Sequence, residues 1–350
     1  MLGCAPSSAC SSIPTSVPPA RTAASPCTIC HRAPTRSRRG TKCSARRGNR
    51  SRSARKNHRR WRLPSPASDF VALTKPRLNF LVLLTTAAAY SLGSGPESTL
   101  SQFVHTLVGT FLVAGGASAL NQAWERDTDR LMRRTRMRPI ADLRMPPSAA
   151  IIFGLSLTVL GATELAYFLN PLTSSVALFT SASYLLLYTP LKTRTSLSTI
   201  VGALPGALPA VIGWAAATNT LSIEAWVLFG IVFMWQMPHF LAIAWMYRDE
   251  YARAGMPLLP VIQPDGRSTG RQAVIYTAAL IPLSMMPTGV GLASPWYLIG
   301  ALTLGAILMV MSLEFSTKRT IETARRLFFS SILYLPILWA LLVFDHRAHF

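Results

Sequence analysis

Residues 223–246 read IEAWVLFGIVFMWQMPHFLAIAWM. This run is apolar almost throughout and carries one charged residue, Glu224. About 20 such residues, wound as an α-helix, cross the hydrocarbon core of a bilayer. Because backbone groups in lipid must be hydrogen-bonded within their own segment, the run predicts a transmembrane helix.

Eight other stretches have the same apolar character, and polar loops separate them. The nine predicted spans lie near residues 77–95, 101–120, 147–168, 172–190, 198–217, 223–246, 273–293, 296–314 and 328–345. Every second loop, beginning with the one after the second span, carries Lys and Arg, whereas the loops between them carry neither. The positive-inside rule then places the N-terminal tail and all basic loops on the cytoplasmic or matrix side. We therefore expect an all-α integral membrane protein with nine transmembrane helices.

The composition divides the chain into two parts. Only 14% of the 350 residues are charged, against about 25% in soluble domains. Residues 1–68 hold 15 of the 35 Lys and Arg and no Asp or Glu, although the whole chain has a formal charge of +21. All five cysteines also lie there, so residues 69–350, the predicted membrane domain, have no thiol chemistry.

Residues 1–68 are expected to be a disordered basic tail, because the segment has too few large apolar side chains to form a core. Three interpretations are open: a mitochondrial transit peptide, a cytoplasmic extension held near anionic lipid, or a start-site artefact. The letters Cys27-Thr28-Ile29-Cys30-His31 match a c-type haem attachment site, but in this low-complexity context we read them as a chance match. No nucleic-acid partner is expected, since no aromatic residues interleave the charges.

The segment ALNQAWERDTDR at residues 119–130 carries a stripe of oxygen ligands at the end of the second span. Asn121, Glu125 and Asp129 follow one another at i, i+4 and i+8, which places them within about 80° on one helical face. Such a stripe suits Mg²⁺, which takes one or two carboxylates and completes its shell with water and phosphate oxygens. A solvated helix end is the alternative, but Asn121 beside an apolar span favours the protein interior.

Basic residues follow the stripe directly. Arg134 and Arg138 lie in MRRTRMRP at residues 132–139, and Lys192 lies in the next basic loop. Guanidinium groups bind phosphate oxygens in a bidentate way, so these side chains are candidate diphosphate contacts. The alternative is a set of ordinary positive-inside anchors.

A second acidic segment, YRDEYARAGMP at residues 247–257, follows the sixth span on the same predicted membrane side. Asp249 and Glu250 are candidates for the opposing half of a metal-diphosphate site, with Arg248 as a further substrate contact. Two acidic patches facing each other would hold more than one Mg²⁺. A Gly- and Pro-rich run, residues 202–209, predicts a broken helix that lines a cavity.

Four motifs together resemble the UbiA-type prenyltransferase superfamily, and within it the branch that farnesylates haem. They are Asn121-Gln122-x-x-Glu125-x-x-x-Asp129, Arg134-Thr135-x-x-Arg138-Pro139, Trp235-Gln236-x-Pro238-His239-Phe240 and Asp249-Glu250-Tyr251-Ala252-Arg253-Ala254-Gly255. The first motif marks the superfamily, and the last two mark the haem branch. The resemblance runs from Leu73 to Pro336. It implies helices around a central cavity, with Mg²⁺ and a diphosphate under a cytoplasmic cap.

The resemblance also implies a reaction. Farnesyl diphosphate loses diphosphate to give an allylic cation, the vinyl group of haem B adds to it, and water completes the hydroxyethylfarnesyl group of haem O. Such an ionisation needs cations around the leaving diphosphate and a dry apolar cavity around the carbocation.

By motif match, Asn121, Glu125 and Asp129 fall at the first metal-diphosphate positions of the family. Glu250 falls at the second, where the family commonly has Asp, so whether Asp249 or Glu250 is the metal-side acid stays open. The match also implies diphosphate contacts for Arg138 and Lys192.

Two residues inside the sixth span are candidate contacts to the haem. Trp235 and His239 lie in a membrane helix, where polar groups are costly unless they face the protein interior. His239 is a candidate for contact with the haem or a propionate, or for proton transfer. An interhelical hydrogen bond is the alternative.

Two rival functions remain at this point: a prenyltransferase with an aromatic quinone-precursor acceptor, and a secondary transporter. Transport is disfavoured because the acids gather at one membrane face, whereas transporter sites lie near the midplane. The short loops resemble those of bacterial members of the family more than those of mitochondrial ones, which implies a bacterial inner membrane, with the mitochondrial inner membrane as the alternative. The expected partners are the lipid bilayer and a haem A synthase or a terminal oxidase under assembly.

Overall fold

The computed structural model describes residues 66–349, which form helices joined by short loops, and no strand occurs in this range. The all-α class predicted from the sequence is therefore confirmed for the described part of the chain. The predicted basic tail falls almost entirely outside the described residues.

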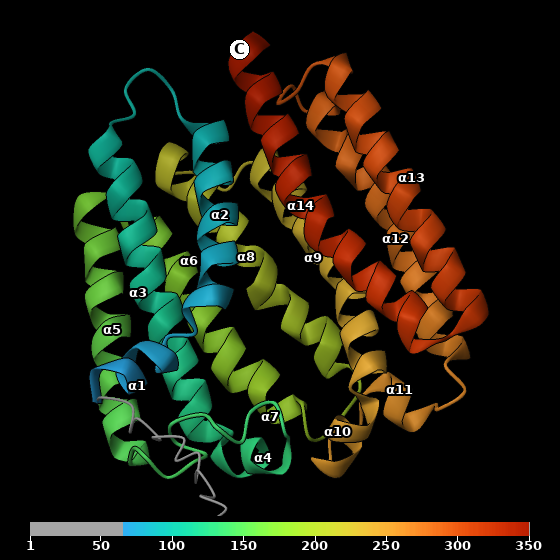
Figure 1. The fold of residues 1–350 in the computed structure, drawn as a ribbon. Helices are drawn as coiled ribbons and strands as arrows, with labels where there is room; N and C mark the ends of the chain where they lie inside the picture. Colours follow the sequence, from blue (N-terminus) through green and yellow to red (C-terminus); the bar gives the residue numbers. More distant parts are fainter. Residues whose placement is uncertain (1–65, 350) are drawn as a thin grey trace, which may run out of the picture. The chain divides into compact units, whose positions relative to one another are not determined.

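Nine long helices build the bundle (Figure 1). They are α2 (Pro76–Gly93), α3 (Leu100–Trp124), α5 (Pro147–Phe168), α6 (Pro171–Ala182), α8 (Ser198–Thr218), α9 (Ile223–Met246), α12 (Arg267–Gly289), α13 (Pro295–Lys318) and α14 (Ile321–His349). Short elements complete the described chain: α1 (Pro66–Leu73), α4 (Arg126–Leu131), the π-helix η1 (Ser183–Tyr188), α7 (Thr189–Leu191), α10 (Arg248–Arg253) and α11 (Leu259–Ile262). Figure 1 shows α4, α7, α10 and α11 gathered at one end of the bundle.

Seven helices of the described range are long and apolar enough to cross a membrane. In the third of them, α6, η1 and α7 run on as one segment from Pro171 to Leu191. The helices α2 and α12 coincide with two further predicted spans but are not among the seven, so the count of nine spans is not confirmed. Polar residues lower the hydropathy of both helices: Arg77 and Asn79 lie in α2, and Arg267 and Arg271 lie in α12.

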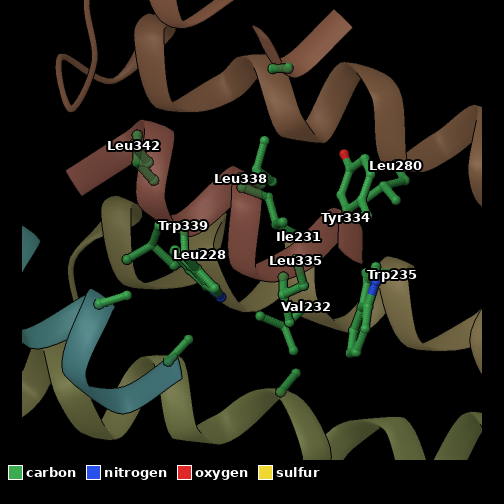
Figure 2. Close-up of a cluster of buried hydrophobic side chains, with 14 of the residues drawn as sticks. Leu228, Ile231, Val232, Trp235, Leu280, Tyr334, Leu335, Leu338, Trp339 and Leu342 are labelled. Carbon is green, nitrogen blue, oxygen red and sulfur yellow. The ribbon is translucent and has the colours of Figure 1, made fainter. Parts of the chain in front are cut away.

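The main core is built by α2, α8, α9, α12, α13 and α14, and Figure 2 shows the part of it between α9 and α14. Leu228, Ile231 and Val232 of α9 face Leu335 and Leu338 of α14 and are almost completely buried. Apolar side chains from both helices thus form a continuous wall.

A second contact, between α3 and α5, depends on glycines. A Cβ added at Gly116 would lie 2.5 Å from the carbonyl oxygen of Gly154, and one at Gly161 would lie 2.7 Å from that of Gly109. Small residues at such positions let two membrane helices approach backbone to backbone.

The prediction of a broken helix at residues 202–209 is wrong. Helix α8 continues from Ser198 to Thr218 through Pro205 and Pro209. Membrane helices tolerate proline where they pack within a bundle, and a hydrogen bond of 3.2 Å from Thr86 Oγ1 of α2 to the carbonyl oxygen of Pro209 ties α8 to its neighbour.

Candidate active site

The predicted stripe of ligands lies where α3 ends and α4 begins. Helix α3 ends at Trp124, α4 begins at Arg126, and Glu125 between them has φ −86° and ψ 7°, so the stripe does not lie on one continuous helix. Asn121, Glu125 and Asp129 are all buried nevertheless. Asp127, in contrast, has a side chain that is 70% exposed.

Each member of the stripe contacts one cationic side chain. The Lys75 Nζ donates to Asn121 Oδ1 at 3.2 Å, and Lys192 Nζ donates to Glu125 Oε1 at 2.7 Å. Arg138 Nη1 contacts both carboxylate oxygens of Asp129, at 2.9 and 2.7 Å. Three protein cations and the three predicted ligands therefore form one cluster.

The π-helix η1 supplies the wall beside this cluster. π-Helices are rare and occur frequently at functional sites. Tyr184 OH donates to Asn121 Oδ1 at 3.0 Å, and Asn121 Nδ2 donates to Thr189 Oγ1 at 3.0 Å. The Lys192 ammonium lies 4.5 Å from the centre of the Tyr188 ring. Two tyrosines of η1, Tyr184 and Tyr188, thus lie beside the cluster.

The charge states of the two main pairs follow from their surroundings. Burial by itself would raise the pKa of Glu125, but the Lys192 ammonium holds it below its ordinary value, so the carboxyl is ionised. Burial opposes the charge of Lys192, but Tyr188 and Glu125 raise its pKa above the ordinary value. For Asp129, burial raises the pKa and outweighs the Arg138 guanidinium.

Lys75 differs from the other cations. Burial, followed by the like charges of Arg138 and Lys192, lowers its pKa from 10.5 to about 7. No carboxylate among the described residues lies within ion-pair distance of it, and its backbone has φ 47°. Lys75 immediately precedes α2 and lines the large cavity described next.

Two adjoining cavities meet at the cluster. A small one of about 160 Å³ is lined by polar and charged side chains that include Glu125, Asp129, Arg134, Arg138 and Lys192. A larger one of about 540 Å³ extends between the helices and is mostly apolar. Both are lined by Glu125, Arg138, Tyr188 and Lys192, so a charged compartment opens beside an apolar one.

The loops before α5 and after α9 meet over the small cavity. Arg134 Nη2 donates to Tyr251 OH at 3.2 Å, and Met132 packs with Ala254 and Met256. Residues that directly follow the first acidic segment, 119–130, thus contact residues of the second, 247–257.

The acids of the second segment do not line either cavity. The Asp249 side chain is 86% exposed and Glu250 is half-buried. Arg248 stacks on the Trp245 ring, with Cζ 4.3 Å from the ring centre. A metal role for Asp249 or Glu250 stays a prediction.

The two candidates in α9 lie on the wall of the large cavity. Trp235 Nε1 donates to the carbonyl oxygen of Ser331 at 2.6 Å, and His239 Nδ1 lies 2.8 Å from Ser331 Oγ. The interhelical hydrogen bond considered for His239 is therefore present, and the ring also lines the cavity.

The oxygen ligands of the site suit Mg²⁺ when a diphosphate supplies further ligands. No group of three or more His, Cys, Asp or Glu in residues 66–349 is arranged to hold a metal ion. Glu125 and Asp129 are hard oxygen ligands, and Asn121 adds an amide oxygen. Mg²⁺ commonly binds to one or two carboxylates and takes the remaining ligands from water and substrate phosphate, so the residues fit a metal that arrives with a diphosphate.

Three residues of the site were not singled out from the sequence. Lys75 and Tyr184 contact Asn121, and Ser198, the first residue of α8, lines the small cavity. Ser198 is completely buried, and its hydroxyl has no hydrogen-bond partner among the described residues. In the sequence these three residues are marked only by their position next to basic or apolar segments. Many other residues share that position, so it did not identify them as part of the site.

Comparison with known proteins identifies the family of the chain. The model of the UbiA prenyltransferase family matches residues 82–334. The protoheme IX farnesyltransferase of Solibacter usitatus is 46% identical over 79% of this chain and 98% of its own length. That of Myxococcus xanthus is 43% identical over 83% of this chain and 98% of its own length.

Solved structures share the fold at low sequence identity. One described as digeranylgeranylglyceryl phosphate synthase matches with a TM-score of 0.69 and 14% identity, over 81% of this chain and 99% of that one. A UbiA homolog from Archaeoglobus fulgidus, bound to GPP and Mg²⁺, matches with a TM-score of 0.55 and 15% identity, over 78% of this chain and 99% of that one. The chain is a multi-pass membrane enzyme, and it belongs to the UbiA prenyltransferase family, in the group of the protoheme IX farnesyltransferases.

Proposed function

We propose that this enzyme transfers the farnesyl group of farnesyl diphosphate to a vinyl group of haem B and so forms haem O, with Mg²⁺ bound to the diphosphate. The observation that carries the proposal is the junction of the two cavities: a compartment lined by Arg134, Arg138 and Lys192 opens directly into a mostly apolar one. A substrate with an anionic head and an apolar tail matches this division. The names of the relatives, which are protoheme IX farnesyltransferases, support the choice of prenyl donor and acceptor.

The charged compartment supports departure of the diphosphate. As the bond between C1 of the farnesyl group and its oxygen breaks, the electron pair moves to the diphosphate, and Arg138 and Lys192 stabilise the growing negative charge. Mg²⁺, held by Asn121, Glu125 and Asp129, would neutralise further charge on the same oxygens. The three ligands are already held in place by Lys75, Lys192 and Arg138.

The apolar compartment protects the allylic cation. A cavity of about 540 Å³ is in the range of small-molecule sites, and its apolar walls limit early capture by water. The vinyl group of haem B then forms a bond to C1 of the farnesyl group. Water adds to the resulting cation next to the macrocycle and loses a proton, which gives the hydroxyethylfarnesyl group.

For the cellular setting, we propose a bacterial inner membrane with the basic loops in the cytoplasm, where a soluble diphosphate substrate and Mg²⁺ are available. The relatives from Solibacter usitatus and Myxococcus xanthus support the bacterial setting. A haem A synthase or a terminal oxidase under assembly is the proposed recipient of the product.

A test of the acceptor compares two compounds in vesicles that contain the purified protein, labelled farnesyl diphosphate and Mg²⁺. We expect label to enter haem B and not 4-hydroxybenzoate. Incorporation into 4-hydroxybenzoate alone would assign the enzyme to a quinone-precursor acceptor instead. Label that enters neither compound would refute prenyl transfer to either class.

A further inference from the structure

The hydrogen bonds around His239 determine which of its ring nitrogens carries a proton. Ser331 has one hydroxyl hydrogen, and Ser331 Oγ donates it to the carbonyl oxygen of Phe328 at 2.7 Å. When Ser331 makes that bond, the contact of 2.8 Å between Ser331 Oγ and His239 Nδ1 is donated by Nδ1. In the neutral imidazole the other nitrogen, Nε2, then keeps its lone pair.

The orientation of the ring is fixed as well. The His239 ring stacks on Phe328 with 4.9 Å between the ring centres, and on Trp235 with 5.3 Å. Trp235 is itself held by its hydrogen bond of 2.6 Å to the Ser331 carbonyl. Contacts from α9 and α14 thus hold the imidazole through two stacked rings and at Nδ1.

The remaining nitrogen is available to a ligand. No hydrogen bond within residues 66–349 engages His239 Nε2, and the residue lines the large cavity. The described lining of that cavity contains no other histidine and no methionine or cysteine. A neutral, clamped imidazole that donates its second N–H to a protein acceptor is the usual arrangement of a metal-binding histidine.

On this geometry we propose that His239 Nε2 is the axial ligand of the haem iron when haem B occupies the large cavity. The inference rests on the proposed function, because it takes haem B as the acceptor. Ligation fixes the macrocycle against the wall formed by α9 and α14, while the charged cluster lies at the junction with the small cavity. It makes His239 a substrate-binding residue that selects an iron porphyrin over the metal-free ring.

The experiment is spectroscopic and needs no turnover. Purified full-length protein in nanodiscs is titrated with haem B, and the Soret band and the iron–nitrogen stretch in resonance Raman are recorded. We expect the wild type to show histidine ligation. His239→Ala should lose that signature and bind haem B at least tenfold more weakly, and added imidazole should restore the signature by occupying the vacated position.

Three comparisons separate ligation from a structural role. His105→Ala removes a histidine that pairs with Glu164 and lines neither cavity, and it should behave as the wild type. Metal-free protoporphyrin IX should bind equally to the wild type and to His239→Ala. Ser331→Ala keeps His239 but removes the acceptor of its Nδ1–H, so the iron–nitrogen stretch should move to lower frequency.

The two possible failures are distinguishable. If the wild type binds haem B and His239→Ala gives an identical spectrum, the ligand assignment is wrong and the proposed function stands. If the wild type binds no haem B, the acceptor itself is wrong, and the ligand assignment falls with it.

Discussion

Lys192 and Glu125 lie 67 positions apart in the chain, and their side chains form an ion pair in which Nζ is 2.7 Å from Oε1. The pair joins the loop before α8 to the junction of α3 and α4, and both residues line the two cavities. Removing one partner of a buried pair leaves the other charge uncompensated, which costs more than a surface pair would. The charged end of the cavity is therefore held together before any substrate binds.

The first prediction concerns the carboxylate of Asp129. Asp129→Asn should lower kcat about a hundredfold or more, since it removes a proposed carboxylate ligand of the Mg²⁺ that neutralises the departing diphosphate, and it should weaken the dependence of the rate on Mg²⁺. The measurement is turnover of farnesyl diphosphate across a Mg²⁺ titration. Asp127→Asn is the matched control on the same short helix, because its side chain is exposed. An Asp129→Asn enzyme with wild-type kcat and Mg²⁺ response would remove this residue from the site.

The second prediction concerns the hydroxyl of Ser198. Ser198→Ala should raise the Kd for magnesium diphosphate about tenfold, the effect of losing a hydrogen bond to a charged group. Isothermal titration with inorganic diphosphate and Mg²⁺ measures it directly. Ser196→Ala makes the same chemical change two residues earlier, at a position that lines neither cavity, and should leave the Kd unchanged. Equal affinities for all three proteins would show that the buried hydroxyl does not meet the diphosphate.

The third prediction concerns the contact between the two loops. Tyr251→Phe removes the acceptor of the 3.2 Å hydrogen bond from Arg134. Without this bond the two segments close the small cavity less tightly and admit water, which captures the farnesyl cation as farnesol. The variant should therefore release more farnesol for each haem modified, with little change in thermal stability. Product ratios by chromatography measure this partition. An unchanged ratio would indicate that the loops exclude water without this bond.

The fourth prediction concerns helix packing. Gly116→Ala places a Cβ 2.4 Å from Thr158 Oγ1 and 2.5 Å from the Gly154 carbonyl oxygen, and overpacking of this kind costs about 1–3 kcal/mol. Gly289→Ala, where a Cβ meets nothing within 4 Å, is the control. Thermal unfolding in detergent should show a lower Tm for the first variant only. Equal Tm values would contradict close packing of α3 on α5.

The sequence was most informative where a local pattern carried the chemistry. The apolar runs predicted the helices, and the spacing of Asn121, Glu125 and Asp129 predicted a common buried side even though the helix breaks at Glu125. These features depend on residues within one or two turns of each other.

The features that the sequence did not predict depend on tertiary contacts. Lys75 reaches Asn121 across 46 positions, and Ser331, the partner of His239 that the sequence did not identify, lies 92 positions away from it. Neither contact has a periodic signal in the chain, because it arises only when two helices pack. The continuity of α8 through Pro205 and Pro209 was missed for the same reason: it depends on the packing of α8 within the bundle, which has no signal in the local sequence.

The central claim is that the farnesyl cation adds to the vinyl group of haem B and that water completes the product. It is tested most directly by incubating the purified enzyme with farnesyl diphosphate, haem B and Mg²⁺ in ¹⁸O-labelled water and analysing the porphyrin by mass spectrometry. We predict a haem that has gained one farnesyl group and one hydroxyl group carrying ¹⁸O. Unmodified haem alongside consumed farnesyl diphosphate, or a farnesylated haem without ¹⁸O, would contradict the account.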